Sequence, residues 1–359
     1  MSSSRGIVLA WVSNRFAAMP KKALYFGKKG DRLVCTLCPH SCIVDEGERG
    51  LCGVREARCD ELISLNYGVL IAAHIDPVEK KPLYHFLPGS ESLSVAAPGC
   101  NLSCKWCQNW DISQLPVLEP ETMSQLARKS VPPQEIVTAA LRAGVPSISY
   151  TYTEPTIYYE YALDTMKLAK DQGIRNIWVT NGFINSRPLL ELKGLLDAAN
   201  VDFKFVSRQA MERWTGGRPT PVMNAMRLMK RMGVWIEVTT LLVPGVNDTD
   251  HELRGIAGFI SRELGPETPW HVSGFYPAFK VKDIPPTPKE SMMRAMDIGG
   301  KEGLSFIYPG NRDMPGFEDT RCPSCGATLI KRHWFSVSQN RLKEGKCPDC
   351  GTPIPGAWK

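Results

Sequence analysis

The chain has 359 residues, of which 43% are hydrophobic and 22% charged, and this balance is typical of a globular protein with a sizeable core. That length exceeds one ordinary domain and suits an α/β barrel with small additions. The net charge of +6 is modest and spread along the chain, so we expect no nucleic-acid partner, and no apolar run approaches the ~20 residues that a membrane span needs.

Residues 1–18 are predicted to be weakly ordered and without function. Their apolar run from Gly6 to Val12 is short for a signal peptide and lacks a convincing cleavage site. An amphipathic transit peptide is a minor alternative, because no acidic residue precedes Asp31, and a true start at Met19 is another. We expect a cytoplasmic protein.

Twelve cysteines are spaced like metal ligands rather than like disulfide partners. They form a group of four, a single residue, a group of three and a second group of four, at positions 35, 38, 42, 52, 59, 100, 104, 107, 322, 325, 347 and 350. A reducing cytoplasm keeps such thiols available for metals.

The segment 19–90 is predicted to be a cysteine-rich unit before the main domain. Cys35, Cys38, Cys42 and Cys52 fall within eighteen residues and can hold one ion or one cluster. Zinc and a second iron–sulfur cluster both remain open, as does a cysteine-rich fold without metal. A nearby histidine, His40, could replace one thiol, and the cysteine at position 59 is a spare.

Residues 76–89 are dense in charge and proline, so neither a long helix nor an interior strand is expected there. Such a segment just before the next cysteine group could border an active site. A solvated connector explains the composition equally well.

Three further cysteines follow the pattern C-x3-C-x2-C at Cys100, Cys104 and Cys107. A closed zinc site normally takes four protein ligands, whereas three thiolates suit a 4Fe-4S cubane with one iron left open. With Trp106 before the last cysteine, the pattern resembles the signature of radical S-adenosylmethionine (radical SAM) enzymes. In that family the open iron binds the amino and carboxylate groups of SAM. Ordinary buried thiols or part of a zinc knuckle are the alternatives.

From residue 91 to 318 apolar runs alternate with helical segments at a period near thirty residues. Strands are expected at 93–97, 145–153, 174–180, 201–206, 234–243, 270–275 and 304–308. Helices are expected at 133–144, 156–173, 186–199, 221–233 and 248–265, and from a capping box at 287–290 towards residue 303. The pattern predicts an α/β fold with a parallel sheet, namely a partial (β/α)6 TIM-like barrel.

Polar residues stand where several of these strands end. They are Glu154, Asn181, Asp202, Lys204 and His271. Each alone is an ordinary turn signal, but their common register indicates a site at the carboxyl edge of the sheet.

The tail, residues 319–359, carries two C-x2-C knuckles twenty-one residues apart. Their thiols belong to Cys322, Cys325, Cys347 and Cys350. This spacing predicts a zinc ribbon, and a rubredoxin-like iron site that relays electrons is the alternative. We expect a separable module, because the tail is too short to build a substantial core without a metal.

From about Lys22 to Lys359 the chain resembles the radical SAM component of the AmmeMemoRadiSam system, a branch related to pyruvate formate-lyase activating enzymes. The resemblance rests on Cys-Pro-His at 38–40, the segment 76–86, the run 100–109, Tyr-Thr-Glu-Pro at 152–155, Thr-Asn-Gly at 180–182, Asp-Phe-Lys at 202–204 and the terminal Cys-Pro-x-Cys-Gly pair.

The resemblance implies a role for each site residue. Cys100, Cys104 and Cys107 would hold the 4Fe-4S cluster, with no catalytic residue expected beyond it. Glu154 stands where the family's Gly-Gly-Glu motif contacts the SAM amino group, with tyrosine and threonine in place of the two glycines. By the same resemblance, residues 181, 202, 204 and 271 line the SAM pocket.

The implied activity is reductive cleavage of SAM to methionine and a 5′-deoxyadenosyl radical that abstracts hydrogen. A flavodoxin- or ferredoxin-type protein would supply the electron. The target is either a glycine of a partner protein or a small molecule, with Memo-type and AMMECR-type companions. A non-catalytic iron–sulfur electron-transfer protein and a zinc-ribbon nucleic-acid binder are the other classes considered, and the cysteine triad with the strand-end residues disfavours both.

Overall fold

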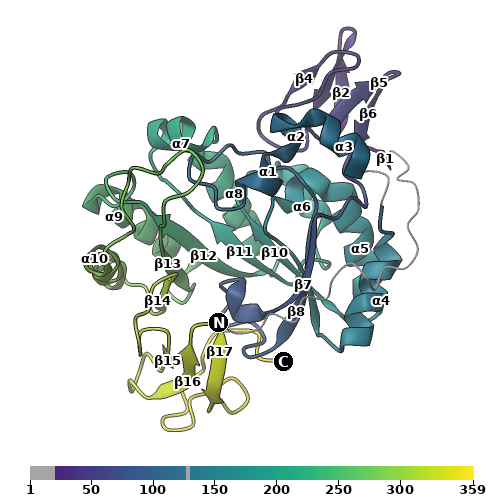
Figure 1. The fold of residues 1–359 in the computed structure, drawn as a ribbon. Helices are drawn as coiled ribbons and strands as arrows, with labels where there is room; N and C mark the ends of the chain where they lie inside the picture. The colour runs from purple at the N-terminus through teal and green to yellow at the C-terminus, as the bar shows by residue number, and fades with distance from the viewer. Residues whose placement is uncertain (1–20, 127–129) are drawn as a thin grey trace.

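An eight-stranded sheet forms the centre of the computed structural model, which describes residues 21–126 and 130–359 (Figure 1). Its strands follow one another in sequence order: β7 (Ala72–Pro77), β8 (Glu91–Ala96), β9 (Ser147–Tyr150), β10 (Arg175–Thr180), β11 (Ala198–Asp202), β12 (Trp235–Leu242), β13 (Trp270–Gly274) and β14 (Ile307–Gly310). The first pair is antiparallel, and each later strand runs parallel to its predecessor. Most residues of β9 to β13 are buried, which explains their continuous apolar runs.

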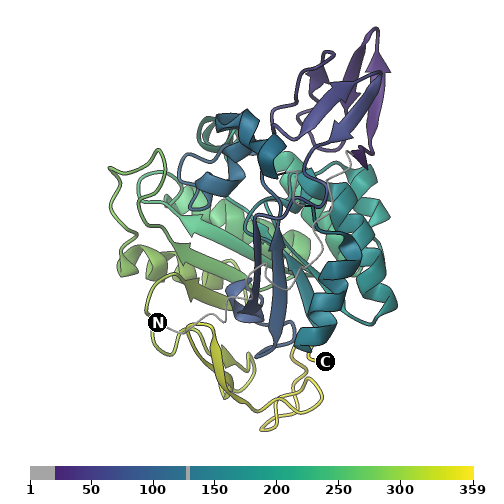
Figure 2. The same cartoon turned by 45° about the vertical axis from the view of Figure 1, so that its right-hand side comes forward.

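Helices connect the parallel strands, which confirms the predicted α/β class. They are α1 (Trp110–Ser113), α2 (Leu115–Leu118), α3 (Pro120–Leu126), α4 (Pro133–Ala143), α5 (Tyr159–Asp171), α6 (Ser186–Glu191), α7 (Arg208–Thr215), α8 (Pro219–Arg231), α9 (Asp250–Phe259) and α10 (Lys289–Lys301). Shorter turns are η2 (Val78–Lys80), η3 (Pro155–Tyr158) and η4 (Ile260–Leu264). Right-handed crossovers between strands in sequence order place the connecting helices on one face of the sheet (Figure 2).

Local chemistry explains where these helices begin and end. Helix α4 has a proline in its first turn, where no intrahelical partner is needed for the missing N–H. It ends at Gly144, whose φ of +67° lies in the left-handed region that glycine enters without strain. Its residues Ile136, Val137 and Ala140 are buried, so one face of the helix packs on the core.

Two predicted elements between β10 and β12 are wrong in their bounds. The helix expected at 186–199 ends at Glu191, because a turn containing Gly194 (φ +79°) follows it and residue 198 already begins β11. The strand expected at 201–206 leaves the sheet after Asp202, and the side chains of Phe203 and Phe205 are then fully buried.

Two helix starts also differ from the sequence analysis. Helix α7 was not predicted, although Ser207 caps it by accepting a hydrogen bond from the Ala210 N–H at 3.3 Å. The capping box at 287–290 is not formed. The hydroxyl of Thr287 instead donates to the Leu242 carbonyl (2.6 Å) and accepts from the Phe275 N–H (2.7 Å), so it ties β12 to the end of β13.

The N-terminal lobe consists of two small antiparallel sheets beside one end of the central sheet (Figures 1 and 2). One contains β2 (Phe26–Lys29), β3 (Arg32–Cys35) and β4 (Ile43–Val44), and the other β1 (Lys21–Lys22), β5 (Arg55–Arg58) and β6 (Glu61–Ser64). Arg55 joins the lobe to α5 through a fully buried ion pair, with 2.7 Å from its Nη2 to each oxygen of Glu160. Residues 1–18 and Met19 lie outside the described residues.

The C-terminal module is a three-stranded antiparallel sheet of β15 (Thr320–Arg321), β16 (Thr328–His333) and β17 (Ser336–Asn340). It packs against the main domain, and the expectation of a separable module stays a prediction. Tyr84 and Tyr308 share a buried apolar cluster with residues of the module. The buried Arg332 guanidinium donates to the Tyr84 carbonyl at 2.7 Å and lies 4.3 Å from the centre of the Tyr84 ring. The predicted lack of a membrane span agrees with the described helices, none of which is long and apolar enough to cross a bilayer.

The buried His85 side chain links the module to the sheet. Its Nδ1 lies 2.7 Å from the Pro355 carbonyl and must donate to it, so Nε2 accepts from the Tyr308 hydroxyl, also at 2.7 Å. Burial lowers the pKa of His85 to about 4. In the unfolded chain the His85 ring binds a proton below about pH 6.5, whereas in the folded chain it does so only near pH 4. Stability from this group is therefore complete above pH 6.5 and is lost as the pH falls towards 4.

We expect acid to destabilise the unaltered protein more than the His85→Gln variant, which cannot titrate at this position. Between pH 7 and 4.5 the difference in their unfolding free energies should narrow by about 2 kcal/mol. Urea unfolding at the two pH values measures it. The control is His251→Gln, which replaces an exposed histidine and shows how the loss of a histidine elsewhere affects the unfolding free energy. If the difference in unfolding free energy between the unaltered protein and His85→Gln stays constant with pH, the inference that His85 is buried in its neutral form is wrong.

Candidate active site

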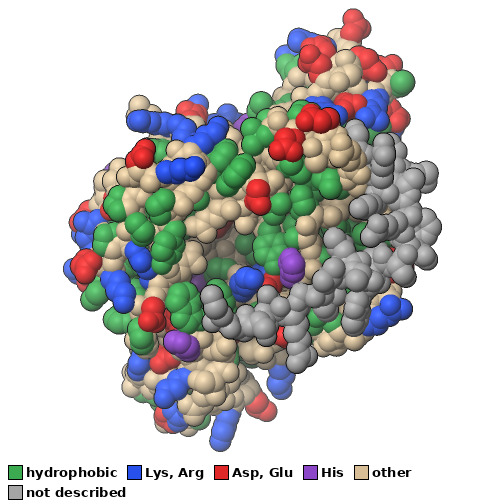
Figure 3. All heavy atoms as spheres, in the orientation of Figure 1, with side chains coloured by type: hydrophobic (Ala, Val, Ile, Leu, Met, Phe, Trp, Pro, Cys, Tyr) green, Lys and Arg blue, Asp and Glu red, His purple; other side chains and the backbone are tan. Residues whose placement is uncertain are grey.

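A cavity of about 580 Å³ opens at the carboxyl ends of the parallel strands (Figure 3). All nine residues predicted to bind the cofactor line it: Cys100, Cys104, Trp106, Cys107, Glu154, Asn181, Asp202, Lys204 and His271. The sequence separates them by up to 171 positions, and the parallel sheet brings them together because each strand ends at the same edge.

The loop that carries the three thiols follows β8 and is anchored on the end of α7. The Ser103 N–H donates to the Thr215 carbonyl at 2.9 Å, and the Lys105 N–H donates to the Trp214 carbonyl at 3.0 Å. Trp106 is buried and packs on the Trp214 ring, with 5.7 Å between ring centres. These contacts hold the loop in place independently of any bound group.

The three cysteines are partly buried, among charged groups. Burial raises the pKa of Cys100 well above its usual range. Burial also raises the pKa of Cys104 to about 12, although the nearby Lys204 ammonium opposes this. Both thiols are neutral at pH 7, and iron must displace their protons to bind. Three thiols on one loop, with a lysine cation beside them, are a donor set that fits an iron–sulfur cluster with one corner left for another ligand.

Glu154 connects the ends of β9 and β10. Its Oε1 accepts from the Thr156 N–H (3.0 Å), the Thr156 hydroxyl (2.6 Å) and the Thr180 hydroxyl (2.8 Å). Its Oε2 accepts from the Asn181 N–H at 2.8 Å. Burial raises the pKa of Glu154, and these hydrogen bonds oppose the shift. The carboxylate is thus held rigidly, and Oε2 keeps capacity for one more donor.

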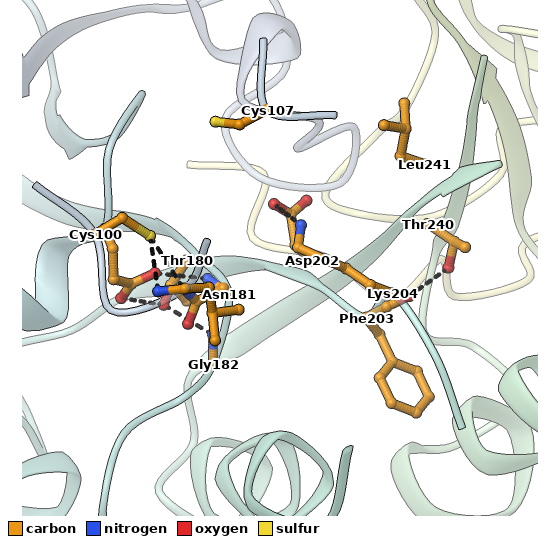
Figure 4. Close-up of polar contacts among 12 residues, drawn as sticks. Cys100, Cys107, Thr180, Asn181, Gly182, Asp202, Phe203, Lys204, Thr240 and Leu241 are labelled. Atoms are coloured by element: carbon orange, nitrogen blue, oxygen red, sulfur yellow. Dashed lines mark hydrogen bonds and ion pairs between the residues drawn. The ribbon is translucent and has the colours of Figure 1, made fainter. Parts of the chain in front are cut away.

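Asn181 and the Asp202–Lys204 pair lie on different sides of the space between the cysteines (Figure 4). The Asn181 Nδ2 lies 3.6 Å from the Cys100 sulfur. Across the space, the Lys204 ammonium contacts the Asp202 carboxylate at 2.8 Å. Burial lowers the pKa of Lys204, but Asp202 and Cys104 outweigh this and raise it overall. The cavity therefore presents a fixed cation and two carboxylates, which match the charges of an amino acid group.

His271 is fixed from below the cavity. Its Nε2 lies 2.7 Å from Oε2 of Glu237, a fully buried carboxylate that also accepts from the N–H groups of Tyr84 and His85 at 2.9 and 2.7 Å. Burial raises the pKa of Glu237, but the hydrogen bond from His271 and the other donors lower it overall. The ring of His271 is therefore oriented by a satisfied buried charge.

The segment 76–89 borders this cavity, so the solvated-connector alternative is wrong. Lys81 is buried and contacts Asp76 at 2.8 Å, and burial lowers the pKa of Lys81 to about 8. Asp76 also accepts from the hydroxyl of Tyr152, whose ring centre lies 4.7 Å from the Lys81 ammonium.

Tyr152 stands at the first of the two positions that the resemblance noted in the sequence assigns to glycine. Its φ is +65°, in the left-handed region that favours glycine. The bond to Asp76 and the contact with Lys81 hold the tyrosine in this conformation. The replacement is visible in the sequence, but these contacts could not be predicted from it, because both partners lie more than 70 positions away. Phe335, from the C-terminal module, also lines the cavity and was not predicted.

The four N-terminal cysteines line a second, small pocket. Cys59 does not belong to it and is exposed in the turn between β5 and β6. His40 lies at the same pocket, with its Nε2 2.7 Å from the Asn101 carbonyl.

The four C-terminal cysteines form a compact set. Within the parts of the chain that the structure describes, they are the one group of potential ligands whose donor atoms all lie within 4.8 Å of one another. The sulfurs of Cys322 and Cys350 are 3.6 Å apart, and those of Cys325 and Cys347 are 3.7 Å apart. Four thiolates at ~2.3 Å from one tetrahedral ion would be about 3.8 Å apart. The predicted four-cysteine metal site is therefore present in the structure, although its geometry suits zinc and iron alike.

Residues 94–259 match the family described as the Radical SAM superfamily. The uncharacterized protein MJ0808 of Methanocaldococcus jannaschii is 41% identical over 346 residues, which cover 93% of this chain and 98% of that protein. The pyruvate formate-lyase-activating enzyme of Clostridium pasteurianum is 23% identical over 54% of this chain and 83% of its own. A solved radical SAM methyltransferase from Sphaerobacter thermophilus is 14% identical, with a TM-score of 0.46 over 82% of this chain and 77% of that one.

We expect the Cys322→Ser, Cys325→Ser variant to bind one metal ion fewer per chain, because two of the four converging thiols are lost. Elemental analysis of the purified protein measures this, and thermal unfolding should begin at a lower temperature because metal binding stabilises so small a module. The Cys59→Ser variant is the control, since its exposed thiol belongs to no group. Equal metal content in the two variants would contradict the site.

Proposed function

The chain belongs to the radical SAM superfamily, and on this premise we propose that it cleaves SAM reductively at a 4Fe-4S cluster to abstract hydrogen from a substrate. The observation that carries the proposal is the convergence of three thiols, the carboxylates of Glu154 and Asp202, and the buried Lys204 on a single cavity at the carboxyl edge of the sheet. We interpret that sheet as the predicted partial (β/α)6 barrel, because its strands follow sequence order without the two edge strands pairing.

Cys100, Cys104 and Cys107 would hold the cluster. When bound and reduced, such a cluster supplies the electron that breaks the sulfonium C–S bond of SAM into methionine and a 5′-deoxyadenosyl radical. The free acceptor capacity of Glu154 Oε2 suits the SAM ammonium group, and the Lys204 ammonium suits its carboxylate or ribose. Because these charges are already fixed by neighbouring groups, little reorganisation is needed when SAM binds.

The cavity walls contribute by excluding water. Tyr84 and Phe335 line the cavity beside the polar groups, and Trp106 packs beneath the cysteine loop. A dry cavity strengthens each charged contact and protects a reactive radical from side reactions. Excluding water and protecting the radical require no further acidic or basic side chain from the described residues.

The similarity to activating enzymes supports a glycine of a partner protein as the hydrogen donor. The alternative is a small molecule processed within the AmmeMemoRadiSam system, with Memo-type and AMMECR-type partner proteins. The wall contributed by Phe335 favours this alternative, because it narrows the space that a protein loop would have to enter. Deuterium transferred to 5′-deoxyadenosine from labelled partner protein or labelled small molecule distinguishes the two.

We further propose structural zinc at the C-terminal cysteines and a cytoplasmic location. A flavodoxin- or ferredoxin-type donor would supply electrons. The packing of the C-terminal module on Tyr84 supports a structural role for its metal, since the same contacts position residues of the cavity wall.

We expect the anaerobically reconstituted protein, with dithionite, to convert SAM to 5′-deoxyadenosine and methionine. The triple variant Cys100→Ala, Cys104→Ala, Cys107→Ala should form neither product, because it lacks the cluster ligands. Chromatography of the products measures the reaction, and the Cys59→Ala variant is the control. Full turnover by the triple variant would refute the proposal.

We expect the Glu154→Gln variant to keep its cluster and to bind SAM roughly a hundredfold more weakly, because a charge-assisted contact in a dry site is lost. Calorimetric titration of SAM measures the affinity, and cluster absorbance reports the cluster. The matched control is Thr156→Val, which removes one hydrogen bond to Oε1 but leaves the charge. Its SAM affinity should change only a few-fold. Equal affinities in Glu154→Gln and the unaltered protein would make Glu154 purely structural.

A further inference from the structure

The pocket at the N-terminal cysteines is built by the lobe and the main domain together. Cys35 ends β3, Cys38 and Cys42 flank the loop before β4, and Cys52 lies in the turn before β5. Its other walls include Leu37, Leu51, Ile157 and Asn101. The thiols thus face a largely apolar space. Two segments of the main domain close it, namely η3 just before α5 and the loop after β8.

The sulfurs at this pocket are spaced differently from those of the C-terminal module. Within the described ranges 21–126 and 130–359, no three of them meet the 4.8 Å spacing that the C-terminal four satisfy. Around one tetrahedral ion every pair of thiolates is close, at about 3.8 Å. A cubane instead binds each thiolate through a different iron atom, so its four sulfurs lie farther apart. The N-terminal thiols are thus not gathered around the space of one ion in the way that the C-terminal four are.

A buried donor without a hydrogen-bond partner also lies at this pocket. Arg55 lines the pocket and is 2% exposed. Its Nη2 is used by Glu160, but its Nε has no hydrogen-bond partner among the residues that the structure describes. A buried N–H without an acceptor is costly, and the sulfides and thiolates of an iron–sulfur cluster accept such bonds.

The loops that carry these cysteines are held firmly against the main domain. Asn185 and Arg218 bind the backbone of residues 36–39, with the Arg218 Nη2 2.7 Å from the Pro39 carbonyl and the Asn185 Nδ2 2.8 Å from the Thr36 carbonyl. On the other side, Gly53 lies so close to α2 that an added Cβ would be 2.7 Å from the Pro116 carbonyl oxygen. Since its φ is +70°, this turn requires glycine on two grounds.

Asn101 connects the two cysteine sites directly. It follows Cys100 in the chain and lines the N-terminal pocket. Its carbonyl contacts His40 at 2.7 Å, two residues after Cys38, and its Oδ1 accepts from Asn181 at 2.8 Å. One hydrogen bond, between the backbone next to Cys100 and the side chain two residues after Cys38, therefore connects the loops of the two sites.

We propose that Cys35, Cys38, Cys42 and Cys52 bind a second 4Fe-4S cluster, which receives electrons from a low-potential donor protein and passes them to the cluster at Cys100, Cys104 and Cys107. Each transfer moves one electron: the second cluster is reduced from the 2+ to the 1+ state by the donor and returns to 2+ as the other cluster is reduced. No bond is made or broken and no proton is needed. Leu51 lines the pocket and is 66% exposed, so a donor can approach to within one side chain of the site.

The existence of the second cluster is tested by counting sulfide and iron in three reconstituted full-length proteins. The unaltered chain should hold roughly eight inorganic sulfides, since each cubane carries four. The Cys38→Ser, Cys52→Ser variant and the Cys100→Ser, Cys104→Ser, Cys107→Ser variant should each hold about half of this amount. Cys59→Ser is the matched control and should equal the unaltered chain. Sulfide is the deciding measurement because an isolated iron or zinc ion in the C-terminal module brings none.

Two results would overturn the cluster. The first is a content of about four sulfides in the unaltered chain, together with one zinc ion fewer in the Cys38→Ser, Cys52→Ser variant. This combination would assign zinc to the pocket. The other is equal iron and sulfide in that variant and in Cys59→Ser, which would mean that the pocket holds no cluster. Neither measurement depends on SAM cleavage.

The relay rests on the proposed function and is tested separately by electron paramagnetic resonance. In the Cys38→Ser, Cys52→Ser variant, a reduced flavodoxin should reduce the remaining cluster at least tenfold more slowly than in Cys59→Ser. An unchanged rate would overturn the relay while leaving the second cluster intact. Failure of the proposed function would appear differently, as two reducible clusters in the unaltered protein without any cleavage of SAM.

Discussion

Parallel pairing of seven consecutive strands is the constraint on which the candidate active site depends. Each strand from β9 to β14 pairs in parallel with the one before it, so the carboxyl ends of β8 to β14 reach the same edge. The chain must then leave each strand through a loop at that edge. A helix returns it to the start of the next strand, and these helices cover one face of the sheet. Cys100, Glu154 and Asn181 follow the ends of three different strands and share a cavity for this reason, whereas His271 reaches the cavity from within β13.

Three charges buried near the cavity are placed opposite partners. Glu237 receives His271 and two backbone N–H groups, Lys81 pairs with Asp76, and Lys204 completes the set with the carboxylate beside it. An unpaired buried charge is strongly unfavourable, whereas a satisfied one fixes side-chain geometry. The same pairs therefore keep the main domain folded and keep the polar groups oriented for a charged ligand.

Three cysteine groups in one chain differ in spacing, burial and surroundings. The C-terminal set converges tightly around space for a single ion, and its module packs on Tyr84 and contributes Phe335 to the cavity. The central triad leaves one corner of a cluster to another ligand, which is what a reactive centre needs. The N-terminal set surrounds a more apolar pocket next to Asn101. The spatial order from N-terminal lobe to cavity suits entry of electrons at one end and chemistry at the other.

The sequence by itself determined the features that arise from neighbouring residues. Spacing identified the three cysteine groups, and apolar runs with proline and glycine signals located most strands and helices, because these patterns act over a few residues. Strand-end positions predicted which side chains share the cavity. Only the tertiary structure decided how each group is held: Glu154 by the end of β10, Tyr152 by Asp76, and the cavity wall by Phe335. Their partners lie 26 or more positions away, and such contacts depend on how helices and sheets pack rather than on local preference.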